Sequence, residues 1–341
     1  MEPRPSSADE SRLRATGVEP SGSSPSDRPG VGRREWLGAV GSTTLGGVAA
    51  IGGWGAVPGV PVGIACGASG PCGQEAGVPA DKSPLKGNIN HSVVHWCFGS
   101  LPVETLCEQA ARMGLKSIEL IAPEHWPTLA RFGLTCAIAS SHGFAKGWNH
   151  RENWDFCRET ISAAITAGAE FGCRRVITFS GMLDGIDPDE GVRNTIDGLK
   201  SVVGLAERSG VTLCLEILNT RVDESMKGHP GYQCDTAEWA IAVCDAVGSE
   251  HLKILYDIYH QQIMQGDVIA RIRQYRDYIG HYHTAGVPGR RELDDRQEIN
   301  YPAVMRAIVE SGYDGFVGHE FIPTWDDPLA ALRHAIGVCD V

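Results

Sequence analysis

Residues 252–260, which read LKILYDIYH, contain the pattern on which the predicted fold rests. Apolar and aromatic residues fill every position but Lys253 up to Tyr256, which is typical of a strand buried on both faces. The run then ends on polar residues, Asp257 and His260. Buried strands that finish on polar side chains are typical of parallel sheets with a reactive site at the strand ends.

Seven other short segments share this pattern and alternate with segments of helical period. Strict alternation of strand and helix predicts a parallel sheet, and eight strands predict closure into a (β/α)8 TIM barrel. An open doubly wound sheet is the competing fold, but no G-x-G-x-x-G follows the first strand, so we expect no dinucleotide site. The eight expected strands are Ser92–Phe98, Ser117–Ile121, Thr135–Ser140, Arg175–Ser180, Thr212–Asn219, Leu252–Tyr259, Ile279–Ala285 and Phe316–Ile322.

Seven helices are expected between and after these strands. Glycines follow several of them, where a left-handed backbone conformation ends a helix. Residues 85–341 have the length of a single barrel of about 250 residues, so one domain suffices. The expected helices are Val103–Met113, Asn153–Phe171, Glu190–Arg208, Thr236–Val247, Asp267–Tyr275, Tyr301–Ser311 and Leu329–Cys339.

The composition is that of an ordinary soluble protein, and the charge balance gives no sign of affinity for polyanions. The 341 residues are 42% hydrophobic and 21% charged, which excludes a collagen, a low-complexity chain and a multi-span membrane protein. Thirty Lys and Arg against 42 Asp and Glu give a net charge of −12, so we expect no nucleic-acid partner. The 11 cysteines form no CxxC pair, so buried thiols are expected and neither a disulfide framework nor a zinc ribbon.

Residues 1–84 are interpreted as a disordered tail, an export signal and a linker. Arg33 and Arg34 precede a stretch, 36–74, that contains no charged residue, and this arrangement resembles a twin-arginine signal. A transmembrane helix is the rival interpretation, but the stretch is rich in glycine and broken by Pro58 and Pro61. A chance arginine pair before a flexible linker is the other alternative. We therefore expect export to the periplasm or another extracytoplasmic space, with the membrane involved only in that export.

A second processing signal is weaker. The tripeptide that ends at Cys66 is similar to a lipoprotein cleavage box, but Gly63 occupies a place where a larger apolar residue is usual. The sequence leaves open both lipidation at Cys66 and the cleavage site.

Four expected strands in succession end near a side chain that can bind a metal. Inward-facing carboxylates cannot be buried as separate charges, since each would cost several kcal/mol. A single carboxylate or imidazole at a strand end is more often a helix cap or a hydrogen-bonded core group. Four such side chains at the same depth in neighbouring strands favour a site for a divalent cation. An oxygen-rich set with one nitrogen suits Mn²⁺ or Mg²⁺, with Co²⁺ or Zn²⁺ as alternatives. The four residues are Glu216, Asp257, His283 and Glu320.

Three segments of the second half carry a family resemblance. Residues 280–290 (GHYHTAGVPGR), 298–302 (EINYP) and 315–323 (GFVGHEFIP) resemble the hydroxypyruvate isomerase family of xylose isomerase-like barrels. The resemblance extends more loosely back to Asn90.

The resemblance implies roles for particular residues. It implies that the four residues above hold the metal and that Glu216 and Glu320 also exchange protons with the substrate. His260 and Arg290 would contact substrate, and a loop arginine suits a carboxylate. Asn219, at the end of the expected strand that also carries Glu216, and His142, just after the expected strand Thr135–Ser140, complete the predicted substrate-binding set.

The expected reaction interconverts a small α-hydroxy aldehyde and ketone, of the hydroxypyruvate and tartronate semialdehyde type, through an enediolate. A metal and two carboxylates supply what this proton transfer requires. Several hydroxypyruvate isomerases have Gln where this chain has His283, whereas ketose 3-epimerases have His there. A ketose 3-epimerase, a 2-oxo-tetronate isomerase and a non-catalytic exported sugar-binding barrel therefore stay as alternatives. Endonucleases of the same fold need a cationic surface that this acidic chain lacks. Whether the protein forms a homo-oligomer is left open.

Overall fold

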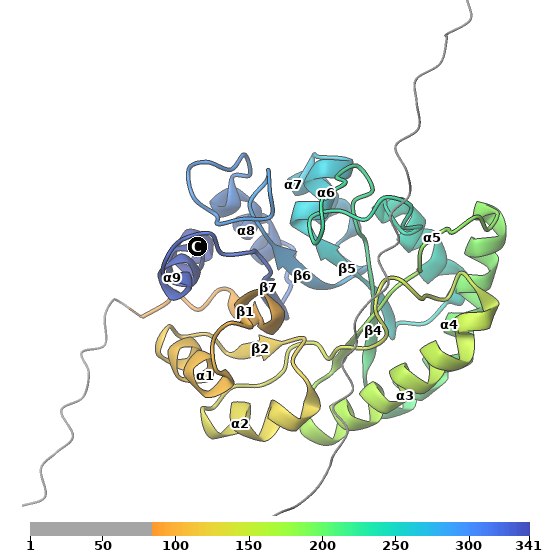
Figure 1. Cartoon of the computed structure of the whole chain (residues 1–341), viewed down its shortest axis with the longest axis horizontal. Coiled ribbons are helices and arrows are strands. Elements are labelled where there is room, and N and C mark those ends of the chain that lie inside the picture. Colours follow the sequence, from red (N-terminus) through yellow and green to blue (C-terminus); the bar gives the residue numbers. More distant parts are fainter. Residues whose placement is uncertain (1–83) are drawn as a thin grey trace, which may run out of the picture. The chain divides into compact units, whose positions relative to one another are not determined.

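Seven parallel strands form the centre of residues 84–341, the part of the chain that this computed structural model describes (Figure 1). The strand order is β2-β1-β7-β6-β5-β4-β3, so strands adjacent in the sequence are mostly neighbours in the sheet. The predictions for the export signal and Cys66 concern residues outside the described range. The strands are β1 (Asn90–Val94), β2 (Ser117–Glu119), β3 (Arg175–Thr178), β4 (Thr212–Glu216), β5 (Leu252–Asp257), β6 (Ile279–Thr284) and β7 (Phe316–His319).

The prediction of a regular strand over Thr135–Ser140 was wrong. Residues 135–139, here called the bridging segment, make only isolated parallel bridges, from Thr135 to Ser117 of β2 and from Ala139 to Val176 of β3. The ladder is interrupted because the backbone N–H of Ala137 donates to the Ser117 hydroxyl at 2.8 Å instead of a backbone carbonyl. The bridging segment still lies between β2 and β3 and closes the barrel.

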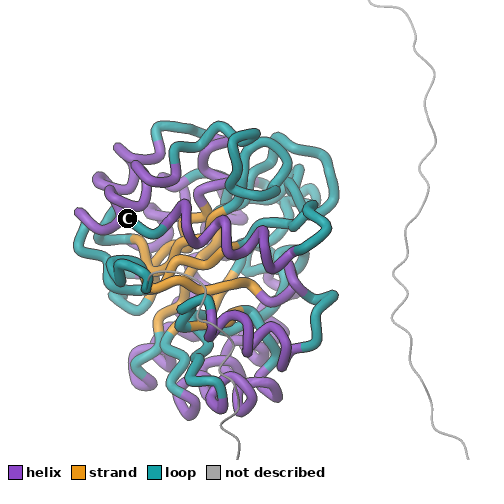
Figure 2. Tube along the Cα trace, turned by 90° about the vertical axis from the view of Figure 1, so that its left-hand side faces the viewer, coloured by secondary structure: helices purple, strands orange, loops and turns teal. Residues whose placement is uncertain are grey.

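Helices surround the strands, which Figure 2 shows as the inner layer. All seven expected helices are present, while α2, α6 and three short 3-10 helices (η1–η3) were not predicted. No helix among residues 84–341 is long and apolar enough to cross a membrane. The elements are α1 (Val103–Arg112), α2 (Trp126–Arg131), α3 (Trp154–Phe171), α4 (Pro188–Ser209), α5 (Ala237–Val247), α6 (Ile258–Met264), α7 (Val268–Tyr275), α8 (Tyr301–Glu310), α9 (Pro328–Cys339), η1 (His95–Phe98), η2 (Pro123–His125) and η3 (Arg151–Asn153).

Local signals set the helix ends. The Asp187 carboxylate accepts a hydrogen bond from the Glu190 N–H at 3.0 Å and caps the start of α4. Gly210 and Gly248 end α4 and α5 with φ angles of 62° and 75°, a left-handed conformation that glycine adopts without strain. The predicted glycine stops are thereby confirmed at these two helices.

Several strands are shorter than predicted at the end that carries the site. β5 stops at Asp257 because its Oδ1 accepts the N–H of Tyr259 at 2.8 Å and of His260 at 3.3 Å, which caps α6. His260 therefore lies in the first turn of a helix and not in a strand. Likewise, β1 ends at Val94, and Trp96 belongs to η1.

The barrel interior combines an apolar core with a buried polar layer. Eight of the nine cysteines in the described range are buried and all nine are free, as expected. Four polar side chains inside the barrel are at most 1% exposed: His91, Glu119, His281 and His319. Buried polar groups need partners. Contacts within the barrel satisfy this layer in part: His91 contacts His319 and His281 contacts Glu119, while His91 Nε2, Glu119 Oε2 and His281 Nδ1 have no partner among residues 84–341.

Candidate metal centre and active site

The four predicted metal ligands converge. Glu216 and Asp257 are the last residues of β4 and β5, His283 is the next to last residue of β6, and Glu320 follows β7. Asp257 pairs with His283 in the sheet register, and His283 pairs with Gly318. One ligand atom from each of the four side chains lies within 4.8 Å of the other three. Neighbouring strand ends of equal depth therefore bring the four groups to one point.

The unsatisfied atoms of this cluster fit a divalent cation. Glu216 Oε1, Asp257 Oδ2 and His283 Nδ1 are buried and have no hydrogen-bond partner within residues 84–341. His283 Nδ1 lies 2.9 Å from Glu320 Oε2 and 3.7 Å from Glu216 Oε1. Buried polar atoms without partners are costly. Three carboxylates and one imidazole facing a common point are a donor set suited to Mn²⁺ or Mg²⁺.

The charges in the cluster perturb one another. Burial raises the pKa of Glu216, and burial together with Glu320 raises the pKa of Asp257 to about 7. Burial would also raise the pKa of Glu320, but the charges of Arg290 and His283 hold it well below its usual range. Three adjacent carboxylates thus resist full ionisation on their own. A divalent cation would relieve that repulsion and take the place of protons.

A cavity of about 240 Å³ adjoins the cluster. Glu216 and Glu320 line this cavity, whereas Asp257 and His283 do not and are fully buried. The two carboxylates predicted to exchange protons are therefore the ones that face the cavity. Apolar side chains form much of the remaining wall, which limits access of water: Trp96, Leu120, Phe144, Ile177, Phe179 and Leu218.

Arg290 also lines the cavity and is 3% exposed. Its Nη2 donates to Glu320 Oε2 at 2.6 Å, and its Nη1 donates to the Met226 carbonyl at 2.7 Å. The guanidinium carbon lies 5.1 Å from the centre of the Trp96 ring. Its Nε has no partner within the described residues. Arg290 is thus held in place by two hydrogen bonds, and its Nε–H donor is left without a partner among these residues.

Asn219 determines which nitrogen of His260 carries the proton. The Asn219 backbone N–H donates to His260 Nδ1 at 3.0 Å, so Nδ1 is an acceptor. Burial lowers the pKa of His260 well below its usual value, and the ring is neutral with its proton on Nε2. That Nε2 lies 3.6 Å from Asp257 Oδ2 and makes no hydrogen bond within residues 84–341. His260 therefore presents a donor toward the cluster, and Asn219 acts through it. Both residues are fully buried and neither lines the cavity, so their predicted contacts with substrate stay predictions.

His142 lines the cavity, but both of its ring nitrogens have partners. Nδ1 lies 2.9 Å from the Lys146 carbonyl, and Nε2 lies 3.0 Å from the Thr178 hydroxyl. Its role as a substrate contact stays a prediction, and the geometry restricts that contact to the ring surface.

Two further groups were not in the predicted site. Trp96 Nε1 donates to Glu320 Oε1 at 3.1 Å, so both oxygens of Glu320 are held. Glu119 Oε1 lies 2.8 Å from His283 Nε2 and 2.8 Å from His281 Nε2. The spacing of His281 and His283 was a usable signal, because alternate strand residues face the same side. Glu119 gave no such signal, since its expected strand continued past it.

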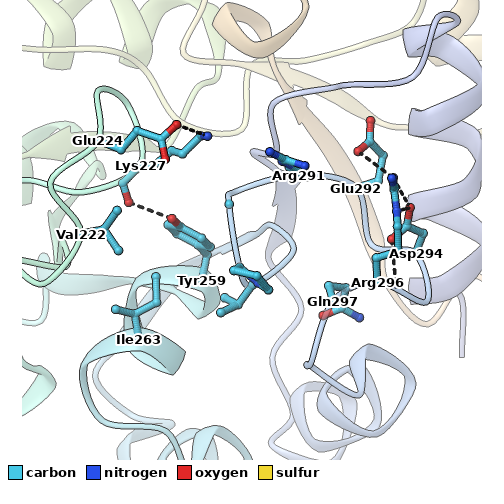
Figure 3. A pocket seen from close by; sticks show the side chains of 13 residues that line it. Val222, Glu224, Lys227, Tyr259, Ile263, Arg291, Glu292, Asp294, Arg296 and Gln297 are labelled. Atoms are coloured by element: carbon cyan, nitrogen blue, oxygen red, sulfur yellow. Dashed lines mark hydrogen bonds and ion pairs between the residues drawn. The ribbon is translucent and has the colours of Figure 1, made fainter.

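A second cavity, of about 430 Å³, lies between loops outside the barrel (Figure 3). The Tyr259 hydroxyl in its wall donates to the Lys227 carbonyl at 2.8 Å, and Lys227 pairs with Glu224. Arg296 pairs with Asp294. None of the four candidate ligands lines this cavity. The site chemistry therefore belongs to the smaller cavity.

The fold agrees with the family comparison. The chain belongs to the xylose isomerase-like TIM barrel family, whose model matches residues 107–339. It is 31% identical to a putative hydroxypyruvate isomerase of Mus musculus, an alignment that covers 74% of this chain and 95% of that protein. It is 28% identical to the hydroxypyruvate isomerase of Escherichia coli (strain K12), covering 68% and 95%. The 2-oxo-tetronate isomerase of Cupriavidus necator is 34% identical, covering 49% and 62%. These relatives support an isomerase.

Solved structures show the same fold. The family 2 AP endonuclease of Brucella melitensis superposes with a TM-score of 0.65 at 23% identity, covering 72% of this chain and 97% of that one. L-ribulose 3-epimerase superposes with a TM-score of 0.61 at 20% identity, covering 73% and 92%. At these identities the likeness extends to the fold alone.

Proposed function

We propose that this protein is a metal-dependent isomerase that interconverts a small α-hydroxy aldehyde acid and the corresponding α-hydroxy ketone, of the hydroxypyruvate type. One observation carries the proposal: four candidate ligands converge at the strand ends, and only the two glutamates among them, Glu216 and Glu320, face the cavity. A pure binding site would not need a proton acceptor at two places around its ligand. The relatives named hydroxypyruvate isomerase support the same reaction class.

Glu216, Asp257, His283 and Glu320 would hold the cation, for which Mn²⁺ or Mg²⁺ fits the oxygen-rich set and Co²⁺ or Zn²⁺ are alternatives. When bound, it would polarise the two substrate oxygens and stabilise the negative charge that develops on them.

The two glutamates would carry the proton. One carboxylate removes the hydrogen from the hydroxyl-bearing carbon, which gives an enediolate, and the other delivers a proton to the former carbonyl carbon. A proton also moves between the two substrate oxygens, so no redox partner is needed. The carboxylate that gained a proton then releases it to solvent and the carboxylate that lost one takes one up, which resets the site. Trp96 and Arg290 hold the two oxygens of Glu320, which fixes the direction in which this carboxylate acts.

Two residues would orient the substrate. The free Nε of Arg290 favours an anionic substrate, because a buried guanidinium binds carboxylates strongly. His260 would donate its Nε2 proton to a substrate oxygen. Arg290 therefore favours a hydroxy-oxo acid over a neutral ketose. A 2-oxo-tetronate, also an acid, is the second candidate substrate, in line with the relative of that name.

A substrate panel tests the proposal. Hydroxypyruvate, 2-oxo-tetronate and neutral ketoses would be incubated with the Mn²⁺-loaded protein in deuterated water and followed by NMR. We expect isomerisation of an acid, with deuterium on the carbon that receives the proton. Turnover confined to neutral ketoses would exclude the acid substrate and favour an epimerase. Ligand binding without turnover of any compound would favour the binding barrel.

A further inference from the structure

His283 is held between two acidic groups on opposite sides of its ring. Its Nδ1 faces the cation cluster, 2.9 Å from Glu320 Oε2, in a geometry that is not a hydrogen bond. Its Nε2 lies 2.8 Å from Oε1 of Glu119, a residue at the end of β2. Both His283 and Glu119 are fully buried. A carboxylate can only accept, so the Nε2 of His283 carries a proton and donates it.

The surroundings of Glu119 are shaped for this contact. His281 donates to the same Oε1 at 2.8 Å from the neighbouring inward position of β6, which fixes the carboxylate from a second direction. Gly318 leaves the necessary space, because a Cβ there would lie 2.2 Å from Glu119 Oε1 and 2.9 Å from His283 Cδ2. The close packing of the carboxylate, the two imidazoles and the glycine therefore holds Glu119 in a defined position next to His283.

We propose that Glu119 is a positioning residue that holds a proton of His283 on Nε2, so that Nδ1 is the nitrogen that binds the divalent cation. The inference rests on the proposed metal dependence. An imidazole binds a cation through an unprotonated nitrogen, and the hydrogen bond of the other nitrogen decides which one that is. Glu119 makes no contact with the cavity, so its effect passes through His283 alone.

Alternative roles fit the geometry less well. Glu119 and the two histidines also form a group that could hold a metal of its own. However, both imidazole nitrogens approach one carboxylate oxygen at 2.8 Å, which is the length of a charge-assisted hydrogen bond. Unlike His283 Nδ1 in the cluster of four, neither of these two Nε2 atoms is left without a hydrogen-bond partner among the described residues. The contacts therefore indicate two N–H donors on one acceptor.

The test compares variants of the full-length protein. Glu119→Ala removes the acceptor, while Glu119→Gln keeps an oxygen in its place without the charge. Glu292→Gln is the matched control, because Glu292 is 1% exposed, accepts hydrogen bonds from Thr324 and Trp325, and lies outside the cluster. The first measurement is the Mn²⁺ dissociation constant by calorimetry on metal-stripped protein. The second is the ring ¹⁵N spectrum of the Zn²⁺-loaded protein with labelled histidine.

Wild type should show one imidazole with a metal-bound Nδ1 and an Nε2 proton protected from exchange with solvent. Glu119→Ala should bind Mn²⁺ 10- to 100-fold more weakly and lose that protection. Glu119→Gln should recover part of the affinity, and Glu292→Gln should match wild type. If Glu119→Ala does not fold, an unchanged affinity in Glu119→Gln overturns the inference.

Equal Mn²⁺ affinity in wild type and both Glu119 variants also overturns it. A wild type that binds Mn²⁺ but isomerises none of the substrates would disprove the proposed function and leave this inference standing. A wild type that binds no divalent cation would disprove both.

Discussion

Arg290 and Glu320 form an ion pair of 2.6 Å in which neither side chain is more than 5% exposed. The pair lies at the cavity wall, where Arg290 also approaches Asp257 to 3.7 Å. The arginine therefore both compensates the acidic cluster and lines the cavity in which we propose that the substrate binds. Changing it should affect binding, turnover and stability together.

Replacing Arg290 should reveal these roles. Arg290→Ala leaves Glu320 without its cation and removes the proposed carboxylate contact, so kcat/KM for the acid substrate should fall by about 10²-fold, or roughly 3 kcal/mol. Arg290→Lys should recover little, because lysine cannot donate to both Glu320 and the Met226 carbonyl from one plane. Steady-state kinetics measures both. Arg296→Ala, which removes an exposed arginine of the same loop, is the control. Equal kinetics in the Arg290 and Arg296 variants would contradict the substrate role.

Glu216→Gln and Glu320→Gln should separate proton transfer from metal binding. Glutamine keeps a ligand oxygen but cannot accept the proton, so turnover should fall by roughly 10² to 10⁴ while the metal stays bound. Elemental analysis and turnover rates check the two effects. Glu224→Gln, an exposed carboxylate beside the outer cavity, should behave as wild type. Near-normal turnover in both site variants would refute the proton-transfer mechanism.

The metal-free protein should become less stable as pH rises toward neutrality. The pKa of Asp257 is about 7 in the fold because of burial and Glu320, against about 3.9 in an unfolded chain. Between these values the folded state binds a proton that the unfolded state does not, so this contribution is full below about pH 4 and is lost as pH rises through about 7.

Urea unfolding of the metal-stripped protein between about pH 5 and about pH 8 measures this dependence. Asp257→Asn should remove that part of the slope. Adding Mn²⁺ to wild type at the upper pH should restore stability, since binding to the folded state stabilises it. Identical slopes for wild type and Asp257→Asn would show that Asp257 does not titrate in this range.

Two glycines give a matched pair for the packing around Glu119. Gly318→Ala places a Cβ 2.2 Å from Glu119 Oε1, so we expect a loss of about 1–3 kcal/mol in unfolding free energy and weaker Mn²⁺ binding. Gly337 lies in α9 with nothing within 4 Å of an added Cβ. Gly337→Ala should be neutral or stabilise by up to about 1 kcal/mol. Thermal unfolding and calorimetry distinguish the two, and equal behaviour would disprove the close approach at Gly318.

Export remains a proposal for residues outside the described structure. Replacing Arg33 and Arg34 by lysine should leave the protein in the cytoplasm, because the uncharged stretch that follows is too rich in glycine to anchor by itself. The same change at Arg12 and Arg14 conserves charge equally and should not affect export. Cell fractionation detects the difference. Unchanged location of the first variant would show that the arginine pair is no signal.

The sequence predicted the barrel and the ligand set because both depend on repetition. Each of the four ligands follows a buried apolar run, and parallel strand ends meet at one edge whatever the details between them. The strand lengths were less predictable. β5 ends at Asp257 because the side chain of Asp257 accepts N–H groups of the following helical turn. The mainly apolar pattern, which continues to Tyr259, does not indicate this strand end.

Contacts between distant segments were beyond the sequence pattern. Glu119 and His283 are 164 residues apart, and only the closed barrel brings β2 opposite β6. The interruption at Ala137 likewise depends on a hydroxyl of another strand. The periodicity of apolar residues indicates which face of a segment is buried. It does not indicate which atoms of a distant segment that face contacts.

Within residues 84–341, the bridging segment is the one position in the barrel where isolated bridges replace a regular strand ladder. The candidate ligands stand on β4 to β7, where continuous ladders tie each strand to its neighbours. The opposite cavity wall, residues 140–144, follows the one stretch of the ring that lacks a regular ladder. Substitutions there can reshape the cavity without breaking strand pairing. A change of cavity shape on that side would therefore leave in place the strand ends that carry the proposed proton-transfer residues.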